Sequence, residues 1–364
     1  MQHEITAAQM LDAFKEDAPG HVADTRWAHT HGLGVMGHFV ASEVARDFCI
    51  AGQFQGHPVA VTARFSNGSS DPQRHDERPD TRGLAVKFHI TDSIDHDLLS
   101  MTMNVFGART REEFLGVSKA FIPKPVEEES WFRRNILDPL MLRSPLPPMP
   151  PGVTISGGPG LAQYAGSHDF ARAFTIEGGL LQVPVSWART AYHAVHTFMA
   201  VGPDGVRRPV RFSWQPIDGV FPVPADQLAT KAHDFLTPEM RARLAQSPAR
   251  FTLKMAIGDP GDALDDPSTT WPVTRQTVSM GTLFIEQMAS DRGIDVDRLS
   301  FNPMRLPPGI EASGDPILHA RGEIYQLGCK ERGGIGCPLH AGAMTATPAP
   351  QQAGTAPRDW ELSQ

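Results

Sequence analysis

The chain has 364 residues, of which 40% are hydrophobic and 20% charged, a composition typical of a globular protein with a large core. Its formal net charge of −8 and its pI near 6.0 argue against a partner with a phosphate backbone, and no basic run indicates nucleic acid or an anionic membrane surface. The amino terminus lacks a basic segment followed by an apolar one, and no apolar run is long enough to span a bilayer. We therefore expect a cytoplasmic protein with no nucleic-acid or membrane partner.

The first predicted element is an amphipathic helix, whose apolar face is formed by Ile5, Ala8, Leu11 and Phe14. We expect it to pack on the rest of the chain or on a partner subunit. Three glycines between residues 32 and 37 then have the G-x-G-x-x-G spacing of a dinucleotide-binding loop. Such a loop follows a buried strand, whereas these glycines follow the sequence WAHTH with three polar side chains. The spacing therefore does not indicate nucleotide binding.

Strands are predicted along much of the remaining chain from the alternation of apolar and polar residues. They cover residues 59–65, 84–90, 193–201, 206–214 and 251–257, with a longer alternating stretch at 273–288. The sequence Gly-Pro-Asp-Gly at 202–205 predicts a hairpin between two of these strands. Because helices interrupt the strands in no regular alternation, we expect an α+β fold built on a barrel or a strongly curved antiparallel sheet.

Helices and irregular segments separate these strands. Residues from about 110 to 140 are predicted to be helical, a further helix opens at Thr237, and the proline-rich residues 144–152 form a connector without regular structure. Residues 341–364 are rich in Ala, Pro, Thr and Gln, so we expect a disordered tail after a single domain at 1–340.

The cysteines are Cys49, Cys329 and Cys337. They are too few and too oddly spaced for a zinc site or a disulfide framework. We expect all three to be reduced structural thiols.

A long helix is predicted to begin at Asp315, an N-cap followed by a proline typical of a first helical turn, and to end at the glycines at 333 and 334. Within it, Arg321 and Arg332 lie four and seven residues from Tyr325 and share its face of the helix. A cation one turn away favours the phenolate of a tyrosine, whose ordinary pKa is about 10, so Tyr325 is a candidate anionic metal ligand. A tyrosine packed in the core beside solvated arginines is the alternative, and this helix alone leaves both open.

Several short motifs follow one another along the chain. They are Arg26-x-x-His29-x-x-Gly32-x-Gly34-x-x-Gly37-x-Phe39, Ala63-Arg64-Phe65-Ser66, Arg82-Gly83-Leu84-Ala85-Val86-Lys87-Phe88, Trp271-Pro272, Phe301-Asn302-Pro303, Pro308-Gly309-Ile310-Glu311, Asp315-Pro316 and Arg321-x-x-x-Tyr325. In this order they resemble the haem catalase family, and in particular its subgroup of short catalase-related peroxidases. The resemblance implies a catalase-like closed antiparallel β-barrel with surrounding helices and a buried haem b.

The resemblance also implies roles for individual residues. Tyr325 would be the axial ligand of the haem iron, and Arg321 would donate a hydrogen bond to its phenolate oxygen. His29 would take a proton from the peroxide oxygen that binds iron and return it to the outer oxygen, while Ser66 would hold its imidazole in orientation. His31 lies two residues further on and competes for this role, but the motif favours His29.

Four further residues match haem-binding positions of the family. Arg26, Arg64 and Arg332 would bind the haem propionates, since a guanidinium can contact a carboxylate through two hydrogen bonds. Phe114 would stack on the porphyrin face, and an ordinary packing role in a helix is equally open.

The sequence departs from the family pattern at two places. Catalases carry an asparagine that positions the peroxide, and direct alignment puts Met101 or Thr102 there, while Asn104 could serve only after a local shift of the strand. Losing one positioned donor costs a factor of about a hundred in rate. We therefore expect weak residual catalase activity. Further on, Cys329 and Lys330 replace the histidine and arginine usual in the family.

Together these residues predict a haem-dependent peroxidase that reduces hydrogen peroxide or an organic hydroperoxide, using an electron donor that the sequence does not identify. One alternative is an isomerase or lyase acting on fatty-acid hydroperoxides, and another is a haem-binding protein without turnover. His29 and Ser66 argue against the second, because a storage protein needs no proton shuttle. The chain has no room for the terminal domain of larger catalases, so we expect a monomer or homodimer.

Overall fold

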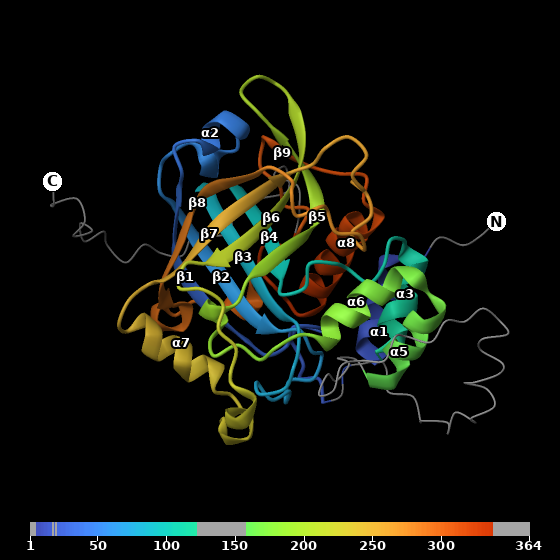
Figure 1. The fold of residues 1–364 in the computed structure, drawn as a ribbon. Coiled ribbons are helices and arrows are strands. Elements are labelled where there is room, and N and C mark those ends of the chain that lie inside the picture. The colour runs from blue at the N-terminus through green and yellow to red at the C-terminus, as the bar shows by residue number, and fades with distance from the viewer. Residues whose placement is uncertain (1–4, 17, 19, 122–157, 338–364) are drawn as a thin grey trace.

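The computed structural model describes residues 5–16, 18, 20–121 and 158–337, and its centre is a closed antiparallel β-barrel (Figure 1). The barrel strands are β1 (Gly32–Ala41), β2 (Val59–Asn67), β3 (Arg82–Thr91), β4 (Ile94–Met101), β5 (Tyr192–Val201), β6 (Arg207–Pro216), β7 (Ala249–Ile257) and β8 (Thr277–Met288). They follow the order β4-β3-β2-β1-β8-β7-β6-β5, and Met101 of β4 pairs with His193 of β5 to close the barrel. A short strand, β9 (Ile310–Ala312), pairs with the other end of β5. The predicted barrel is confirmed.

Side chains alternate along each strand, so that every second one fills the barrel interior and the others form its outer face. In β2, Val61, Ala63 and Phe65 are buried in the barrel core, so the residues between them point outward. Arg64 and Ser66 therefore lie on the outer face of the barrel, although both are buried. Something must cover this face, and the helices do so.

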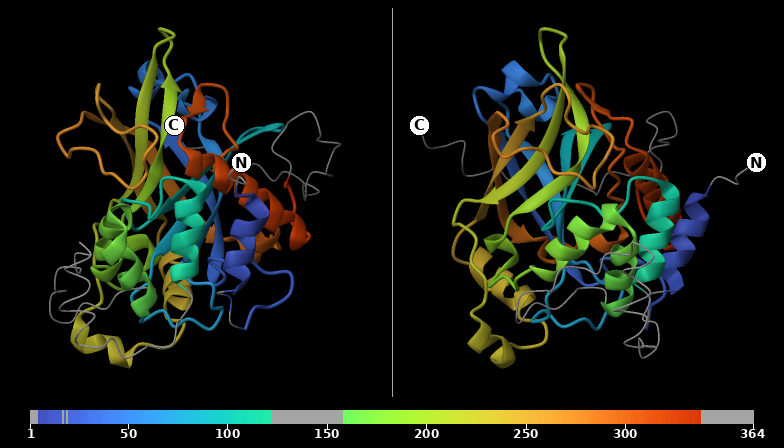
Figure 2. Two further views of the ribbon diagram at one scale, coloured as in Figure 1. Left: turned by 90° about the vertical axis from the view of Figure 1, so that its right-hand side faces the viewer. Right: turned by 45° about the vertical axis from the view of Figure 1, so that its right-hand side comes forward.

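The described helices are α1 (Ala7–Glu16), α2 (Ala45–Phe48), α3 (Arg111–Ala120), α5 (Gly158–Ser167), α6 (Asp169–Gly179), α7 (Leu236–Leu244) and α8 (Pro316–Glu331). Figure 2 shows α1, in dark blue, beside α3 and α8, and these three helices share one apolar cluster. The predicted first helix is thus confirmed, and it packs within the chain. Its apolar face differs from the prediction, since Ala8 is exposed while Ala7 and Met10 are buried.

Three of the predicted segments fall outside the part of the chain that the structure describes. The connector at 144–152, the helical prediction beyond residue 121 and the tail at 341–364 lie outside the described residues. Strands β1, β4 and β9 and helices α2, α5 and α6 were not predicted. The three glycines of the G-x-G-x-x-G spacing lie inside β1, where a Cβ at Gly37 would lie 1.8 Å from the Phe284 carbonyl oxygen. Gly32 and Gly37 allow close approach to neighbouring strands, Gly34 leaves room for Val296, and the three glycines form no phosphate-binding loop.

Helix α8 is fixed at its start and along its length. The Asp315 carboxylate accepts hydrogen bonds from the backbone amides of Ile317 and Leu318 at 2.8 and 3.3 Å, which caps the helix as predicted. Further along, the buried side-chain amide of Asn302 donates a hydrogen bond to the Gly322 carbonyl at 2.8 Å. These contacts fix the start of α8 and hold the helix against the segment that carries Asn302.

Candidate functional site

A cavity of about 540 Å³ lies between the outer face of the barrel and the covering helices. Strands β2 to β5 and helices α1, α3, α6 and α8 all contribute to its wall. Every residue predicted to form the site lines it: Arg26, His29, Arg64, Ser66, Phe114, Arg321, Tyr325 and Arg332. Residues up to 306 positions apart in the sequence, from Arg26 to Arg332, therefore meet in one cavity.

His29 and Ser66 form what we call the histidine group. His29 Nδ1 lies 3.0 Å from Ser66 Oγ, within hydrogen-bonding distance. The backbone of His29 has a φ of 57°, a left-handed conformation that costs a residue with a Cβ about 1–2 kcal/mol. Gly83 of β3 pairs with Ser66, and a Cβ there would lie 2.8 Å from Ser66 Oγ and 3.0 Å from His29 Nδ1. Glycine at this position leaves room for the histidine group.

The surroundings of His29 favour its neutral form. Burial lowers its pKa from the ordinary value to about 3, and the positive charges of Arg64, Arg321 and Arg26 act in the same direction. A neutral imidazole is free to accept a proton at neutral pH. His31, the competing residue, does not line the cavity, and its Nε2 lies 3.8 Å from Asp76 Oδ1 instead.

Tyr325, Arg321, His196 and Asp315 form a second set, the tyrosine group. Arg321 donates one hydrogen bond to the Tyr325 phenolic oxygen at 3.1 Å and another to His196 Nε2 at 2.8 Å. Because a guanidinium only donates, Nε2 accepts and the His196 proton sits on Nδ1, 2.6 Å from Asp315 Oδ2. The predicted contact between Arg321 and Tyr325 is present. The rest of this chain of hydrogen bonds was not predicted.

Sequence reasoning identified Asp315 as a helix cap but missed its second role. Its other carboxylate oxygen accepts from His196, so one side chain both caps α8 and ends the tyrosine group. His196 is almost fully buried and interrupts an apolar strand, which is the signal that could have found it. Burial lowers the pKa of His196, while Asp315 acts to raise it.

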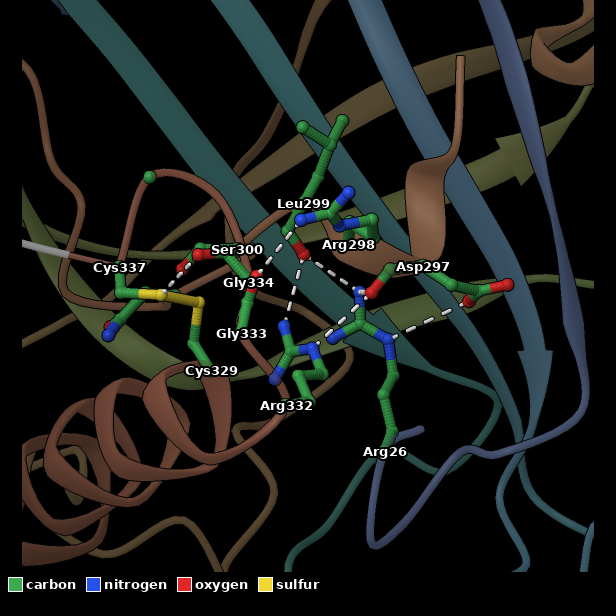
Figure 3. The surroundings of a disulfide bond; sticks show 12 residues. Arg26, Asp297, Arg298, Leu299, Ser300, Cys329, Arg332, Gly333, Gly334 and Cys337 are labelled. Carbon is green, nitrogen blue, oxygen red and sulfur yellow. Dashed lines mark hydrogen bonds and ion pairs between the residues drawn. A yellow bond between two sulfur atoms is a disulfide. The ribbon is translucent and has the colours of Figure 1, made fainter. Parts of the chain in front are cut away.

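Three arginines from distant segments converge on one loop, as Figure 3 shows for two of them. Arg26 and Arg332 both donate to the Leu299 carbonyl, at 2.8 and 3.1 Å. Arg64 Nε donates to the Asp297 carboxylate at 2.7 Å. Sequence reasoning missed Asp297, which nothing in its local pattern distinguishes from a surface carboxylate.

This arginine cluster, Arg26, Arg64 and Arg332, holds more positive charge than Asp297 balances. Burial lowers the pKa of Arg26 well below its ordinary value, and the charges of Arg64 and Arg332 add to the effect. Burial and Arg64 likewise lower the pKa of Arg332 to about 10. Arg26 Nε is buried and has no hydrogen-bond partner among the described residues. The cluster is suited to an anion that enters the cavity.

A disulfide beside this cluster corrects one prediction. Cys329 and Cys337 are bonded, with Cα atoms 5.6 Å apart, so the expectation of reduced thiols was wrong for this pair. Gly333 and Gly336 have φ values of 62° and 73°, and these turns fold the chain back onto the end of α8. Figure 3 shows the bond next to the segment that carries Arg332. Cys49 is a free, buried thiol, as predicted.

The position aligned with the family asparagine carries no amide. Met101 lines the cavity, whereas Asn104 is exposed and its backbone amide donates to Glu177. Thr102 Oγ1 accepts from the backbone amide of Arg82. Phe114 both lines the cavity and packs against Phe14, with ring centroids 5.8 Å apart, so its two predicted roles are compatible.

The catalase family model matches residues 8–138 and 166–337, which is most of the chain. This chain belongs to the catalase family. It is 32% identical to a catalase-related peroxidase of Mycolicibacterium paratuberculosis over 335 residues, which cover 92% of this chain and 97% of the relative. A catalase-related peroxidase of Synechococcus elongatus is 26% identical over 328 residues, covering 90% of this chain and 89% of the relative. The predicted short subgroup of the catalase family is confirmed.

Solved structures agree with the fold. Catalase A from Saccharomyces cerevisiae matches with a TM-score of 0.68 at 19% identity, over 86% of this chain and 62% of the yeast chain. This member of the catalase family therefore spans less than two thirds of that solved relative. At this identity the likeness concerns the fold alone, which is the barrel with its covering helices. Within the described part of the chain, no helix has the length and apolar character needed to cross a membrane.

Proposed function

We propose that this chain is a haem-dependent peroxidase that reduces hydrogen peroxide or an organic hydroperoxide. The observation that carries the proposal is that the histidine group, the Tyr325 and Arg321 side chains of the tyrosine group, and the arginine cluster line one cavity. Each supplies a different requirement of a haem peroxidase: a base for the peroxide proton, an anionic ligand for iron and cations for the propionates. The relatives named catalase-related peroxidases support the same activity.

The described residues fit a haem b. Its two propionates are anions, and the arginine cluster offers three guanidiniums against one carboxylate, with Arg26 Nε 3.9 Å from that carboxylate and without a hydrogen-bond partner among the described residues. Tyr325 faces the cavity with Arg321 beside its oxygen, which is the arrangement that favours a phenolate ligand for iron. Phe114 offers an aromatic ring in the same wall. Bound haem would supply the redox chemistry that cleaves the O–O bond.

The residues of the chain then handle protons and charge. Neutral His29 accepts the proton from one peroxide oxygen and returns it to the other, so that water or an alcohol leaves. Ser66 Oγ holds the imidazole at Nδ1, which leaves Nε2 for this transfer. Arg321 keeps positive charge beside the Tyr325 oxygen, and the buried pair of His196 and Asp315 holds the guanidinium in place.

With Met101 at this position, the site catalyses the dismutation of hydrogen peroxide only slowly. No side-chain amide is present at that position to orient a second peroxide, and removal of one such donor typically costs about a hundredfold in rate. Net peroxidase turnover therefore depends on an external electron donor, with weak residual catalase activity. A thioether in place of an amide also favours a bulkier, less polar hydroperoxide.

The alternative functions are less well supported. The relatives do not favour an isomerase or lyase of fatty-acid hydroperoxides. A haem carrier without turnover has no use for a partly buried histidine held at a φ of 57° against a serine hydroxyl.

The test compares the wild-type protein with His29→Ala. Absorption spectra from 300 to 700 nm, before and after peroxide and a one-electron donor, report haem binding and turnover together. We expect both proteins to bind haem, and the variant to lose about 1000-fold in peroxide-dependent donor oxidation. Unchanged turnover in the variant would contradict the role of His29, and a wild-type protein that takes up no haem would overturn the proposed function.

The same assay sorts the substrates. The rates with hydrogen peroxide and with cumene hydroperoxide are compared at the same donor concentration. Their ratio measures whether the cavity prefers a bulky hydroperoxide to hydrogen peroxide. We expect a higher kcat/KM for cumene hydroperoxide, and product analysis should show cumyl alcohol and oxidised donor. A rearranged product with no donor oxidised would favour the isomerase or lyase instead.

A further inference from the structure

Trp27 lines the cavity and also extends toward the molecular surface. It belongs to the same stretch of wall as Arg26 and His29, yet its side chain is only partly buried. Its Nε1 donates a hydrogen bond to Glu331 Oε2 at 2.9 Å, and the Glu331 side chain is 42% exposed. The indole therefore connects the cavity with a carboxylate that solvent reaches.

Neighbouring side chains hold the indole in place. The His21 ring stacks on it, with centroids 3.6 Å apart and an interplanar angle of 16°. Lys15 Nζ lies 5.6 Å from the ring centroid and 2.9 Å from Glu331 Oε1. Trp27, Lys15 and Glu331 thus link α1, the segment before β1 and the end of α8.

Trp27 is also chemically distinct within the cavity wall. Among the described residues that line the cavity, Trp27 and Tyr325 are the only tryptophan and tyrosine. Tyr325 is assigned to the iron in the proposed function, which leaves Trp27 as the aromatic side chain suited to one-electron oxidation. An indole whose N–H is bonded to a carboxylate can lose its proton together with the electron, which avoids a cation beside Lys15.

We infer that Trp27 transfers electrons into the cavity from an aromatic one-electron donor that docks at the surface beside Lys15 and Glu331. This inference rests on the proposed function, because peroxide acting through the bound haem is the oxidant. A donor too large to enter the cavity reaches only groups that extend to the surface, and Trp27 extends there. The site explains how a buried centre accepts electrons from a bulky molecule.

The electrons and protons balance over two passes. In each pass the indole loses one electron, which the peroxide in the cavity ultimately takes up through the bound haem. The indole also gives its Nε1 proton to the Glu331 carboxylate, which leaves a neutral indolyl radical. A donor AH then returns one electron, Glu331 returns its proton to Nε1, and the donor leaves as the radical A• after releasing a proton. Two passes reduce one hydroperoxide, so that ROOH and two AH give ROH, water and two A•. With a donor that loses an electron without a proton, as ABTS does, the solvent supplies the two protons.

The test uses three haem-loaded proteins: wild type, Trp27→Phe and Trp271→Phe. Trp271 is a matched control, since it packs on Arg211, donates its Nε1 hydrogen bond to the Ala263 carbonyl and does not line the cavity. The bulky donor is ABTS, a sulfonated benzothiazoline, and the small donor is hydroquinone. We expect Trp27→Phe to lower kcat/KM for ABTS by roughly tenfold or more, with a smaller loss for hydroquinone and no change in Trp271→Phe.

A second readout follows the radical itself. Freeze-quenched samples of wild type and Trp271→Phe, mixed with peroxide without donor, should show a tryptophanyl signal by electron paramagnetic resonance, and Trp27→Phe should lack it. Mass spectrometry of the wild-type protein after the same treatment should place added oxygen on Trp27 in excess of Trp271. This measurement needs no variant, so it holds even where Trp27→Phe fails to fold.

The outcomes separate the two proposals. Wild-type protein that oxidises neither donor overturns the proposed function. Wild-type protein that oxidises both donors, while Trp27→Phe oxidises ABTS at the same rate or oxygen is added equally to both tryptophans, overturns the role of Trp27 alone. If Trp27 only braced α1 against α8, Trp27→Phe would show the same radical signal as the wild type. The oxygen added to the wild-type protein would then not concentrate on Trp27.

Discussion

The tyrosine group and the histidine group reach the same cavity, through Tyr325 and His29, but differ in how they are supported. The tyrosine group is a continuous chain of hydrogen bonds that runs from Tyr325 through Arg321 and His196 to Asp315, a fully buried carboxylate. The histidine group consists of His29 and one hydroxyl on a neighbouring strand. The tyrosine group thus has four members, and the histidine group has two.

The difference follows from charge. Arg321 carries a partly buried positive charge, and a charge withdrawn from water is stable only when it is paired and its donors are satisfied. His196 and Asp315 meet both needs. His29 has a pKa of about 3 and is neutral at ordinary pH, so it needs orientation and no counter-ion. A site that fixes a charge requires a network, whereas a site that keeps a base neutral requires burial and one hydrogen bond.

The largest effect should come from the first member of the tyrosine group. Tyr325→Phe keeps nearly the same volume and removes the oxygen proposed to bind iron. We expect haem affinity to fall by more than about 100-fold, the upper end of what loss of one supporting hydrogen bond costs. Titration of the apoprotein with haem, followed by its absorption, measures this. The matched control is Tyr164→Phe, because Tyr164 does not line the cavity. Equal haem affinity in the two variants would contradict the assignment of Tyr325.

The two groups also differ in how far the sequence predicts them. Arg321 and Tyr325 lie four residues apart on one helix, so helical spacing alone placed them on the same face, and Asp315 was predicted at the start of that helix. Alternation in β2 similarly predicted the core of the barrel. The helix left the function of the tyrosine open, and the resemblance to the catalase family was needed to connect it with His29.

What the sequence did not predict depends on contacts between distant segments. His196 approaches α8 from β5, and Asp297 meets the arginine cluster from a loop, so no local spacing indicates either contact. The disulfide was missed because its formation depends on a turn after α8 that brings Cys337 back to Cys329. Strand β1 was missed because its glycines, required for close strand approach, obscure the strand pattern.

An intermediate effect is expected from the last member of the tyrosine group. Asp315→Asn removes the buried negative charge that holds His196, while asparagine remains an equally good helix cap. We expect haem affinity or peroxide turnover to fall by about 10- to 100-fold, the usual cost of losing a residue that supports a metal ligand.

Two measurements distinguish this effect from a loss of stability. Urea unfolding of the apoprotein measures how much the helix cap contributes to the free energy of unfolding. Haem titration measures how much the tyrosine group contributes to haem affinity. Asp204→Asn serves as the control, since Asp204 pairs with Arg208 on the surface hairpin between β5 and β6. If Asp315→Asn lowers the free energy of unfolding but leaves haem affinity and turnover unchanged, the carboxylate acts as a cap alone.

The smallest effect is expected in the histidine group. Ser66→Ala removes the hydroxyl 3.0 Å from His29 Nδ1 but leaves the partly buried imidazole in place. We expect peroxide turnover to fall by about tenfold with haem affinity unchanged, because the hydroxyl orients the base without contacting the proposed haem ligands. Ser42→Ala is the control, as its hydroxyl also makes a hydrogen bond, to the Ser279 carbonyl, away from the cavity.

The pH dependence sharpens this last comparison. The folded-state pKa of His29 lies near 3, below its ordinary value, so the neutral base is fully present at neutral pH and is lost only as pH falls toward 3. Wild-type kcat/KM should therefore stay level through the neutral range and decline only in acid. Ser66→Ala should lie below the wild type by a constant factor across the same range, since burial, the main cause of the low pKa, is retained. An inflection in wild-type kcat/KM near the ordinary histidine pKa would show that the base is solvated, and would contradict a histidine group kept neutral by burial.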